Sequence, residues 1–148
     1  MHAKKILVPI DFSEPSESAL AYAVALAKDH PGAGSQLIVM HTVEAVLPHY
    51  DESLGVLEPE ALRAKLHSLA VSREHQIPIE TLIAYGDPRE EIVNMAREQQ
   101  VDIIVMGTRG RGGIANALLG STAEAVLRNA HCPVLTVRDT AEVTAEPS

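Results

Sequence analysis

The chain has 148 residues and a formal net charge of −8, from 12 Lys and Arg against 20 Asp and Glu, so it fits one compact domain whose field repels polyanions such as nucleic acid. An apolar share of 46% and a charged share of 22% exclude a disordered chain, and one Phe, three Tyr and no Trp leave few rings on which bases could stack. No apolar stretch approaches the roughly 20 residues of a membrane span, the N-terminal apolar run is too short for a signal peptide, and the single Cys132 excludes an internal disulfide framework, so we expect a cytoplasmic protein.

Strand and helix patterns alternate in the first half of the chain. Residues 6–10 form a continuous apolar run, typical of a strand buried on both faces, and Pro9 is tolerable near the end of that strand. Ser13 and Pro15 then mark the start of a helix. The same reasoning predicts a strand at 37–43, an irregular loop or mobile flap at 44–58 and a helix at about 59–75.

The second half continues the alternation. A strand at 79–84 precedes Asp87 and Pro88, a capping residue and a proline that open a helix running to about residue 100. After this helix we expect a strand at 102–106, a glycine-rich segment at 107–121, a helix carrying Val126, Leu127 and Ala130 inward, a strand at 133–137 and a polar tail at 139–148. Residues 1–138 are thus expected to form a single domain.

Five apolar strands separated by helices predict an α/β fold with an open, parallel sheet covered by helices on both faces. In such sheets a ligand binds beyond the carboxyl ends of the strands, where the strand order reverses. Asp11, Thr42 and Gly107 each stand where a predicted strand ends. These three residues are therefore the first candidates for a binding site.

The glycine-rich segment has the chemistry of an anion site. Glycines let backbone N–H groups approach a ligand and form a concave nest. The stretch Ser121–Glu124 is an S-x-x-E pattern, which predicts a capping box and a helix N-terminus with free N–H donors. The hydroxyls of Ser121 and Thr122 add donors, and Arg109 and Arg111 add positive charge. Together these features predict that the segment binds phosphate, although each glycine alone could serve only a tight turn.

Two common phosphate-binding motifs do not account for this segment. A Walker A loop requires a Gly-Lys pair, which the chain does not contain. The dinucleotide fingerprint G-x-G-x-x-[GA] matches Gly110 to Ala115 by letter. A dinucleotide site, however, is built from two mononucleotide-binding halves, and only one predicted strand follows here. We therefore do not expect a dinucleotide.

The arrangement resembles the universal stress protein family, in particular its ATP-binding branch. The family signature G-2x-G-9x-G-[ST] is met by Gly107, Gly110, Gly120 and Ser121. The opening ILVPIDFSE, the Gly86-Asp87-Pro88 segment and the closing Cys132-Pro133-Val134-Leu135 are similar to family hallmarks, and the similarity covers roughly residues 4–138.

This resemblance implies a sheet of order 3-2-1-4-5, of the adenine nucleotide alpha hydrolase-like type, a homodimer formed through the last strand, and ATP as the ligand, which Mg²⁺ could accompany. It places Pro9 and Asp11 beside the adenosine part and Met106 and Gly107 near adenine and ribose, with Thr42 where relatives often have Val. It places Gly110, Arg111, Gly112 and Gly113 along the phosphates, and Gly120, Ser121 and Thr122 at their far side.

Metal ligation and catalysis have little support in the sequence. The seven histidines form no i, i+4 pair and have no cysteine partner, so we expect surface or loop histidines, and for His41 a satisfied structural one. Asp11 suits the orientation of a ligand better than general-base work, because no second carboxylate is evidently paired with it. No group is an obvious activator of water, so we expect no catalytic residue and, at most, slow ATP hydrolysis.

The favoured hypothesis is an ATP-binding dimer that senses or regulates a stress response through an unknown regulatory protein. One alternative is an enzyme, either a slow ATPase or a nucleotidyl-transfer enzyme on the same fold. Another is a chaperone-like dimer whose glycine loop is structural and empty. The loop at 44–58 could be a lid, a docking segment or local packing over the sheet edge.

Overall fold

The computed structural model describes residues 5–29, 34–44, 59–71, 77–109 and 119–138, and within them five strands alternate with four helices. The elements are β1 (Lys5–Pro9), α1 (Glu14–Lys28), β2 (Gln36–Val43), α2 (Pro59–Val71), β3 (Ile79–Tyr85), α3 (Pro88–Glu98), β4 (Ile103–Gly107), α4 (Ser121–Asn129) and β5 (Val134–Val137). Apart from Glu44, the predicted flap at 44–58 lies outside the described residues, and so do the predicted tail at 139–148 and Gly110, Arg111, Gly112 and Gly113.

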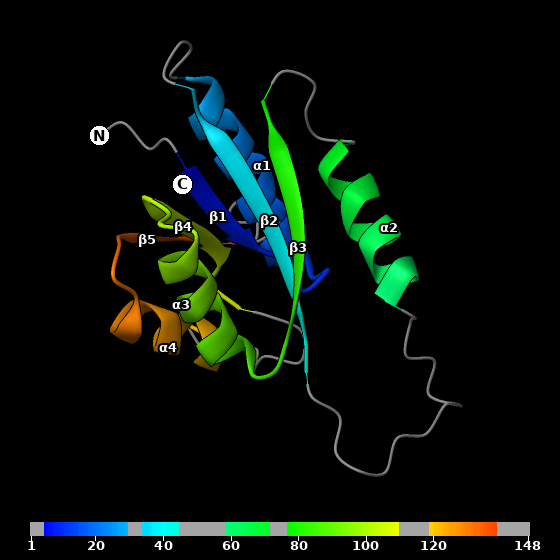
Figure 1. Ribbon diagram of the computed structural model, residues 1–148. Helices are drawn as coiled ribbons and strands as arrows, with labels where there is room; N and C mark the ends of the chain where they lie inside the picture. Colours follow the sequence, from blue (N-terminus) through cyan, green and yellow to red (C-terminus); the bar gives the residue numbers. More distant parts are fainter. Residues whose placement is uncertain (1–4, 30–33, 45–58, 72–76, 110–118, 139–148) are drawn as a thin grey trace, which may run out of the picture.

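The five strands form one parallel sheet in the order β3-β2-β1-β4-β5 (Figure 1). The α/β fold and the strand order predicted from the sequence are therefore confirmed. The chain builds outward from β1 through β2 to β3 and then returns to the other side of β1 with β4 and β5. The order thus reverses between β1 and β4, which is where sheets of this kind bind their ligands.

Alternate side chains of the central strands enter two separate cores, because the side-chain direction alternates along a strand. Ile6 and Val8 of β1 pack with α1 and α2 on one face of the sheet, whereas Leu7 packs with α3 and α4 on the other. All three side chains are fully buried. Helices therefore cover both faces, which explains why the strand at the N-terminus is apolar without alternation. Within the described ranges, no helix has both the length and the apolar content needed to cross a bilayer.

Two helices begin at the capping residues that the sequence predicts. The Ser13 hydroxyl caps α1 by accepting a hydrogen bond from the backbone N–H of Ser16, at 3.4 Å. Asp87 caps α3 by accepting from the backbone N–H of Arg89, at 3.0 Å. Each helix has a proline in its first two positions, where a backbone donor would have no partner inside the helix.

The start of α4 differs from the predicted capping box. Gly120, not Ser121, has the extended backbone of a cap, with φ −72° and ψ 163°, and its carbonyl accepts from the N–H of Glu124 at 2.9 Å. No side chain caps this helix. The prediction was wrong because the S-x-x-E pattern does not reveal which of two neighbouring residues leaves the helical backbone, and glycine occupies the cap position readily.

Helix α4 also buries a narrower face than predicted. Val126 is fully buried, and Ala130, just beyond the end of the helix, is half-buried against the same core, but Leu127 is 45% exposed. Leu127 lies about 100° around the helix from Val126, and in α4 this places it outside the buried face. The inward face is instead formed by Ala123 and Val126, three positions apart.

Candidate functional site

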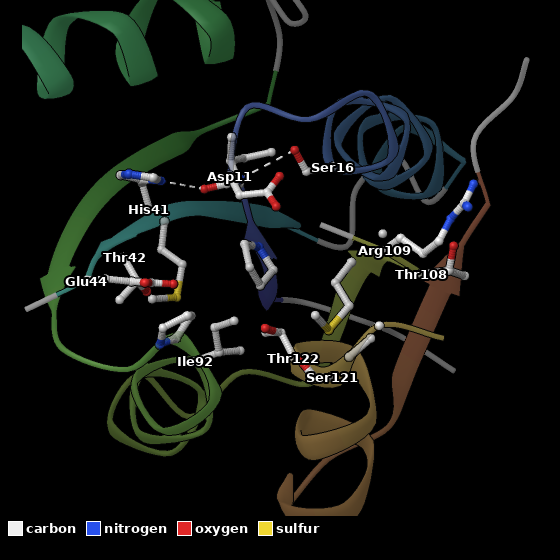
Figure 2. Close-up of a pocket in the computed structure, with 18 residues that line it drawn as sticks. Asp11, Ser16, His41, Thr42, Glu44, Ile92, Thr108, Arg109, Ser121 and Thr122 are labelled. Atoms are coloured by element: carbon white, nitrogen blue, oxygen red, sulfur yellow. Dashed lines mark hydrogen bonds between the residues drawn. The ribbon is translucent and has the colours of Figure 1, made fainter. Parts of the chain in front are cut away.

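A cavity of about 370 Å³ lies at the carboxyl ends of the strands, where β1 and β4 part (Figure 2). Its volume falls within the range of small-molecule sites. All nine predicted site residues within the described chain line it: Pro9, Asp11, Thr42, Met106, Gly107, Arg109, Gly120, Ser121 and Thr122. The fold thus brings together residues that are more than one hundred positions apart in the sequence, and their role in binding stays a prediction.

The turn between β1 and α1 presents Asp11 to the cavity. The carboxylate Oδ1 of Asp11 accepts hydrogen bonds from the Ser13 backbone N–H, at 3.0 Å, and from the Ser13 hydroxyl. The backbone N–H of Asp11 donates to the Ser16 hydroxyl at 3.4 Å, and this hydroxyl donates to the carbonyl of Ser13 at 2.9 Å. Ser13 therefore orients the carboxylate and Ser16 holds the backbone of Asp11 at the end of β1, which prepares the carboxylate to bind a ligand group without further ordering.

His41, near the end of β2, supports the same turn. Its Nδ1 lies 2.7 Å from the carbonyl oxygen of Ile10, and since a carbonyl only accepts, Nδ1 carries the hydrogen. The imidazole also contacts the ring of Phe12, with the two centroids 4.9 Å apart. His41 is half-buried and hydrogen-bonded, which agrees with the expectation of a satisfied structural histidine.

Across the cavity from Asp11, the first turn of α4 offers backbone donors (Figure 2). The N–H groups of Ser121, Thr122 and Ala123 have no acceptor within the helix because they lie in its first turn, and no side chain caps this helix. All three residues line the cavity, and Ser121 and Thr122 add hydroxyls. The helix dipole adds a partial positive charge at the same point. This end of the cavity is therefore suited to a phosphate or another anion.

The two ends of the glycine-rich segment meet beside α4. The N–H of Gly120 donates to the carbonyl of Thr108 at 2.6 Å, and the N–H of Thr108 donates to the carbonyl of Val137 in β5 at 3.0 Å. These bonds anchor both ends of the segment to the sheet edge. Arg109 lines the cavity, although in Figure 2 its side chain extends away from the centre, and its role at the phosphates stays a prediction.

Gly107 has a packing role that the sequence does not reveal. A Cβ atom at this position would lie 2.8 Å from both the carbonyl carbon and the Cβ of Pro15, closer than real Cβ contacts allow. The missing side chain therefore lets the first turn of α1 pack against the end of β4. This packing requirement stands independently of the predicted approach of a ligand to the same residue.

An ion pair lies beside the cavity at the start of α3. The Nη2 of Arg89 is 2.8 Å from Oδ2 of Asp87. Hydrogen bonds from the Arg89 side chain and backbone hold the pKa of the Asp87 carboxyl below its usual value, and Asp87 in turn raises the pKa of Arg89. The stabilisation from this cap is therefore present above the ordinary pKa of an aspartate and is lost as the pH falls through the lowered value. Pro88, between the two, lines the cavity.

The chain matches the model of the Universal stress protein family over residues 2–138. It belongs to the universal stress protein family. It is 36% identical over 139 residues to Universal stress protein MJ0531 of Methanocaldococcus jannaschii, a match that covers 91% of this chain and 82% of that protein.

Solved structures of universal stress proteins show the same fold. The structure of MJ0577, also from Methanocaldococcus jannaschii, superposes with a TM-score of 0.79 at 31% identity and covers 93% of this chain and 97% of its own. A universal stress protein from Archaeoglobus fulgidus, solved in complex with dAMP, superposes with a TM-score of 0.65 at 24% identity, covering 93% of this chain and 99% of its own. The resemblance predicted from the glycine signature and its flanking segments is thus confirmed at the level of the family.

Several residues that line the cavity of this universal stress protein were missed by the sequence reasoning. Pro88 and Ile92 of α3 and Glu44 beyond β2 are among them. The rule that singled out Asp11, a position just after a strand, would also have found Glu44, because it directly follows β2. The position of Ser16 had no comparable signal, since its approach depends on how α1 packs on the sheet.

Among the residues that the structure describes, no group of three or more His, Cys, Asp and Glu could hold a metal ion. Cys132 is half-buried just before β5. Burial raises the pKa of the Cys132 thiol, and the carboxylate of Asp102 raises it further. The thiol is therefore mostly protonated at neutral pH and weakly nucleophilic.

Alkylation of Cys132 tests this electrostatic description. We expect iodoacetamide to modify the folded protein more slowly at neutral pH than the urea-unfolded chain, whose thiol has an ordinary pKa. Asp102→Asn keeps an acceptor for the N–H of Lys5, which lies 2.9 Å from Oδ2, and should speed the reaction by removing the negative charge. Mass spectrometry of timed samples measures both rates, and equal rates for folded and unfolded chains would contradict the prediction.

Proposed function

We propose that this universal stress protein, as a single domain over residues 1–138, binds ATP in the cavity between β1 and β4. It acts as a cytoplasmic, dimeric sensor or regulator in a stress response and signals nucleotide occupancy to a regulatory protein. The observation that carries the proposal is the N-terminus of α4, which has no side-chain cap and faces the cavity opposite Asp11. Backbone donors and a helix dipole at one end of a cavity favour a phosphorylated ligand.

The adenosine part is assigned to the end of the cavity formed by the strands. Met106 and Ile92 are almost fully buried there and offer an apolar surface to a base. Pro9, Thr42 and Gly107 also line the cavity, and the carboxylate of Asp11 can accept hydrogen bonds from ribose hydroxyls. The dAMP complex of the Archaeoglobus fulgidus protein is an adenine nucleotide bound by a protein of this fold, which is compatible with this assignment.

The phosphates are assigned to the opposite end. Ser121 and Thr122 supply N–H groups and hydroxyls, and Gly120 lets the backbone come close. From the sequence signature, Arg109, Gly110, Arg111, Gly112 and Gly113 complete the cradle. Mg²⁺ could accompany the nucleotide on its phosphate oxygens, where it would neutralise charge; no protein ligand for it is assigned.

Calorimetric titration with ATP, ADP, AMP and adenosine tests the assignment. The variant Ser121→Glu tests the proposed phosphate position separately from the fold. A glutamate in the first turn suits the helix dipole, so the fold should be unaffected or slightly stabilised. The same carboxylate occupies the proposed phosphate position and should weaken ATP binding about tenfold or more, while adenosine binding changes little. Ala64→Glu, on the exposed face of α2, adds the same charge elsewhere and is the matched control.

The wild-type titration decides the proposal. Saturable heat with ATP and a rise in Tm at millimolar nucleotide are expected, because a ligand that binds only the folded state stabilises it. No heat and no rise in Tm would contradict ATP binding and favour a structural, empty loop. A steady-state hydrolysis rate above roughly 1 s⁻¹, the low end of ordinary enzymes, would instead favour the enzymatic alternative.

The dimer is assigned to β5. This strand lies at the edge of the sheet, where it pairs with β4 on one side, and its four residues are all half-buried. An open strand edge with partly exposed apolar side chains favours association with a second copy. Analytical ultracentrifugation should therefore give twice the monomer mass, whereas a monomer at micromolar concentration would contradict this assignment.

A further inference from the structure

The turn between β1 and α1 stands between two cavities. Asp11 lines the proposed nucleotide cavity. The next residue, Phe12, lines a second cavity of about 370 Å³ together with Glu17 of α1 and Lys65 and Leu69 of α2. Neighbouring side chains of one short turn therefore face two different spaces, one at the nucleotide cavity and one beside α2.

The backbone of this turn is strained at Phe12. Among the described residues other than glycine, only Phe12 and Gln100 have a positive φ, at 65° and 51°. Gln100 follows the end of α3, where a left-handed residue commonly terminates a helix. Phe12 precedes a helix instead, and a bulky residue adopts this conformation only when surrounding contacts impose it. Contacts that hold the Phe12 ring therefore also hold the backbone next to Asp11.

Two such contacts are present. The ammonium group of Lys65 lies 4.2 Å from the centroid of the Phe12 ring, within the range of a cation–π interaction. The second contact is with His41, whose ring packs against that of Phe12. The Nδ1 of His41 also donates a hydrogen bond to the carbonyl of Ile10, the residue before Asp11. The ring thus connects α2 to the strand end and turn that position the Asp11 carboxylate.

We propose that Phe12 couples the nucleotide cavity to α2, so that a ligand engaging Asp11 restricts the turn, holds the Phe12 ring against Lys65 and stabilises the docking of α2. The identity of the ligand rests on the proposed function, whereas the coupling itself is a property of the ligand-free protein. Such coupling is reciprocal: a change on α2 must alter the turn, and a change at the turn must alter α2.

Amide hydrogen exchange in the ligand-free protein tests the coupling without any nucleotide. The N–H of Ser13 is bonded to Asp11 Oδ1 at 3.0 Å and that of Glu17 to the carbonyl of Ser13 at 3.1 Å, so both exchange only when the turn opens. Lys65→Met keeps the apolar stem and removes the charge. It should speed exchange at both amides about two- to fivefold, the factor that a partly exposed cation–π contact supplies.

Three further variants make this test specific. Lys65→Arg retains the cation and should restore the wild-type exchange rate. Arg63→Met removes the same charge from an exposed position on the same helix and should leave the turn unchanged. In a Phe12→Leu background, Lys65→Met should have no additional effect on exchange. An additional effect would mean that Lys65 acts on the turn through another neighbour, such as Glu17, which lines the same cavity. Equal exchange at the turn in Lys65→Met and wild type would overturn the proposal.

A second experiment measures hydrogen exchange of α2 with and without ATP. When calorimetry shows binding, the amides of Leu66 and Ala70 in α2 should exchange more slowly with ATP than without it, and this protection should be lost in Lys65→Met. ATP binding without protection of α2 would overturn the coupling and leave the proposed function intact. Absence of ATP binding would contradict the proposed function alone, because exchange in the ligand-free variants decides the coupling independently.

Discussion

Replacing Gly107 by alanine is expected to lower the Tm by about 5–10 °C. The added Cβ would lie 2.8 Å from the carbonyl carbon and the Cβ of Pro15 and 2.9 Å from the Pro15 carbonyl oxygen. Two of these atoms belong to the backbone of α1, which cannot turn aside as a flexible side chain can. Overpacking of this kind destabilises by about 2–3 kcal/mol, and for a chain of this size each kcal/mol corresponds to roughly 2–4 °C.

Gly34→Ala is the matched control. Gly34 has a φ of 69°, and nothing lies within 4 Å of the Cβ that alanine would add. This substitution therefore measures the backbone strain of a left-handed alanine alone, about 1 kcal/mol. Differential scanning calorimetry of both variants separates overlap from strain. A Gly107→Ala protein that melts no lower than Gly34→Ala would show that α1 moves off the end of β4 easily and that the packing explanation is wrong.

Asp11→Asn is expected to weaken ATP binding about 10- to 100-fold while leaving the fold intact. The amide oxygen of asparagine can replace Oδ1 as the acceptor for the Ser13 N–H and hydroxyl. The variant loses the charged acceptor for ribose hydroxyls, which is worth about 1.5–3 kcal/mol. Removing a negative charge also relieves repulsion of the triphosphate, by about 0.4 kcal/mol for each phosphate charge at about 10 Å in water, and salt screening reduces this further.

The choice of ligand distinguishes a ribose contact from a phosphate contact. If Asp11 binds ribose, calorimetry of Asp11→Asn should show the same loss for adenosine, AMP and ATP. Unchanged adenosine affinity would contradict the assignment, and stronger ATP binding by the variant would show that repulsion dominates. The free energy of unfolding of the ligand-free variant should stay within about 1 kcal/mol of the wild-type value, since the turn keeps its hydrogen bonds.

Much of the fold could be predicted because its signals are local. The unbroken apolar run that forms β1 requires cover on both faces, and this single requirement leads to a parallel sheet with helices on each side. Ser13 and Asp87 could be identified as caps because a capping side chain bonds to an N–H only two or three residues away. The cap of α4 was assigned one residue too late, since the choice between Gly120 and Ser121 depends on backbone angles.

The candidate site was predicted in its strand-end and glycine segments and missed where it depends on packing between elements. Asp11 and Ser121 could be identified from their residue type and from their position next to a strand or at a helix start. Ile92 resembles any inward residue of an amphipathic helix, and its place in the cavity follows from the packing of α3 beside the end of β2. The exposure of Leu127 was missed for a related reason, because only the final rotation of α4 selects the face that meets the sheet.

By itself, the sequence determined the order of elements, the parallel sheet, the family and several segments that line the candidate site, because each of these depends on residue patterns within short stretches of the chain. Only the tertiary structure decided that Gly107 must lack a side chain against Pro15 and that the first turn of α4 meets the cavity without a side-chain cap. It also decided that Phe12 lies under Lys65 of a helix more than fifty residues away. These contacts join elements that are distant along the chain, and their distances are set only when the helices pack on the sheet.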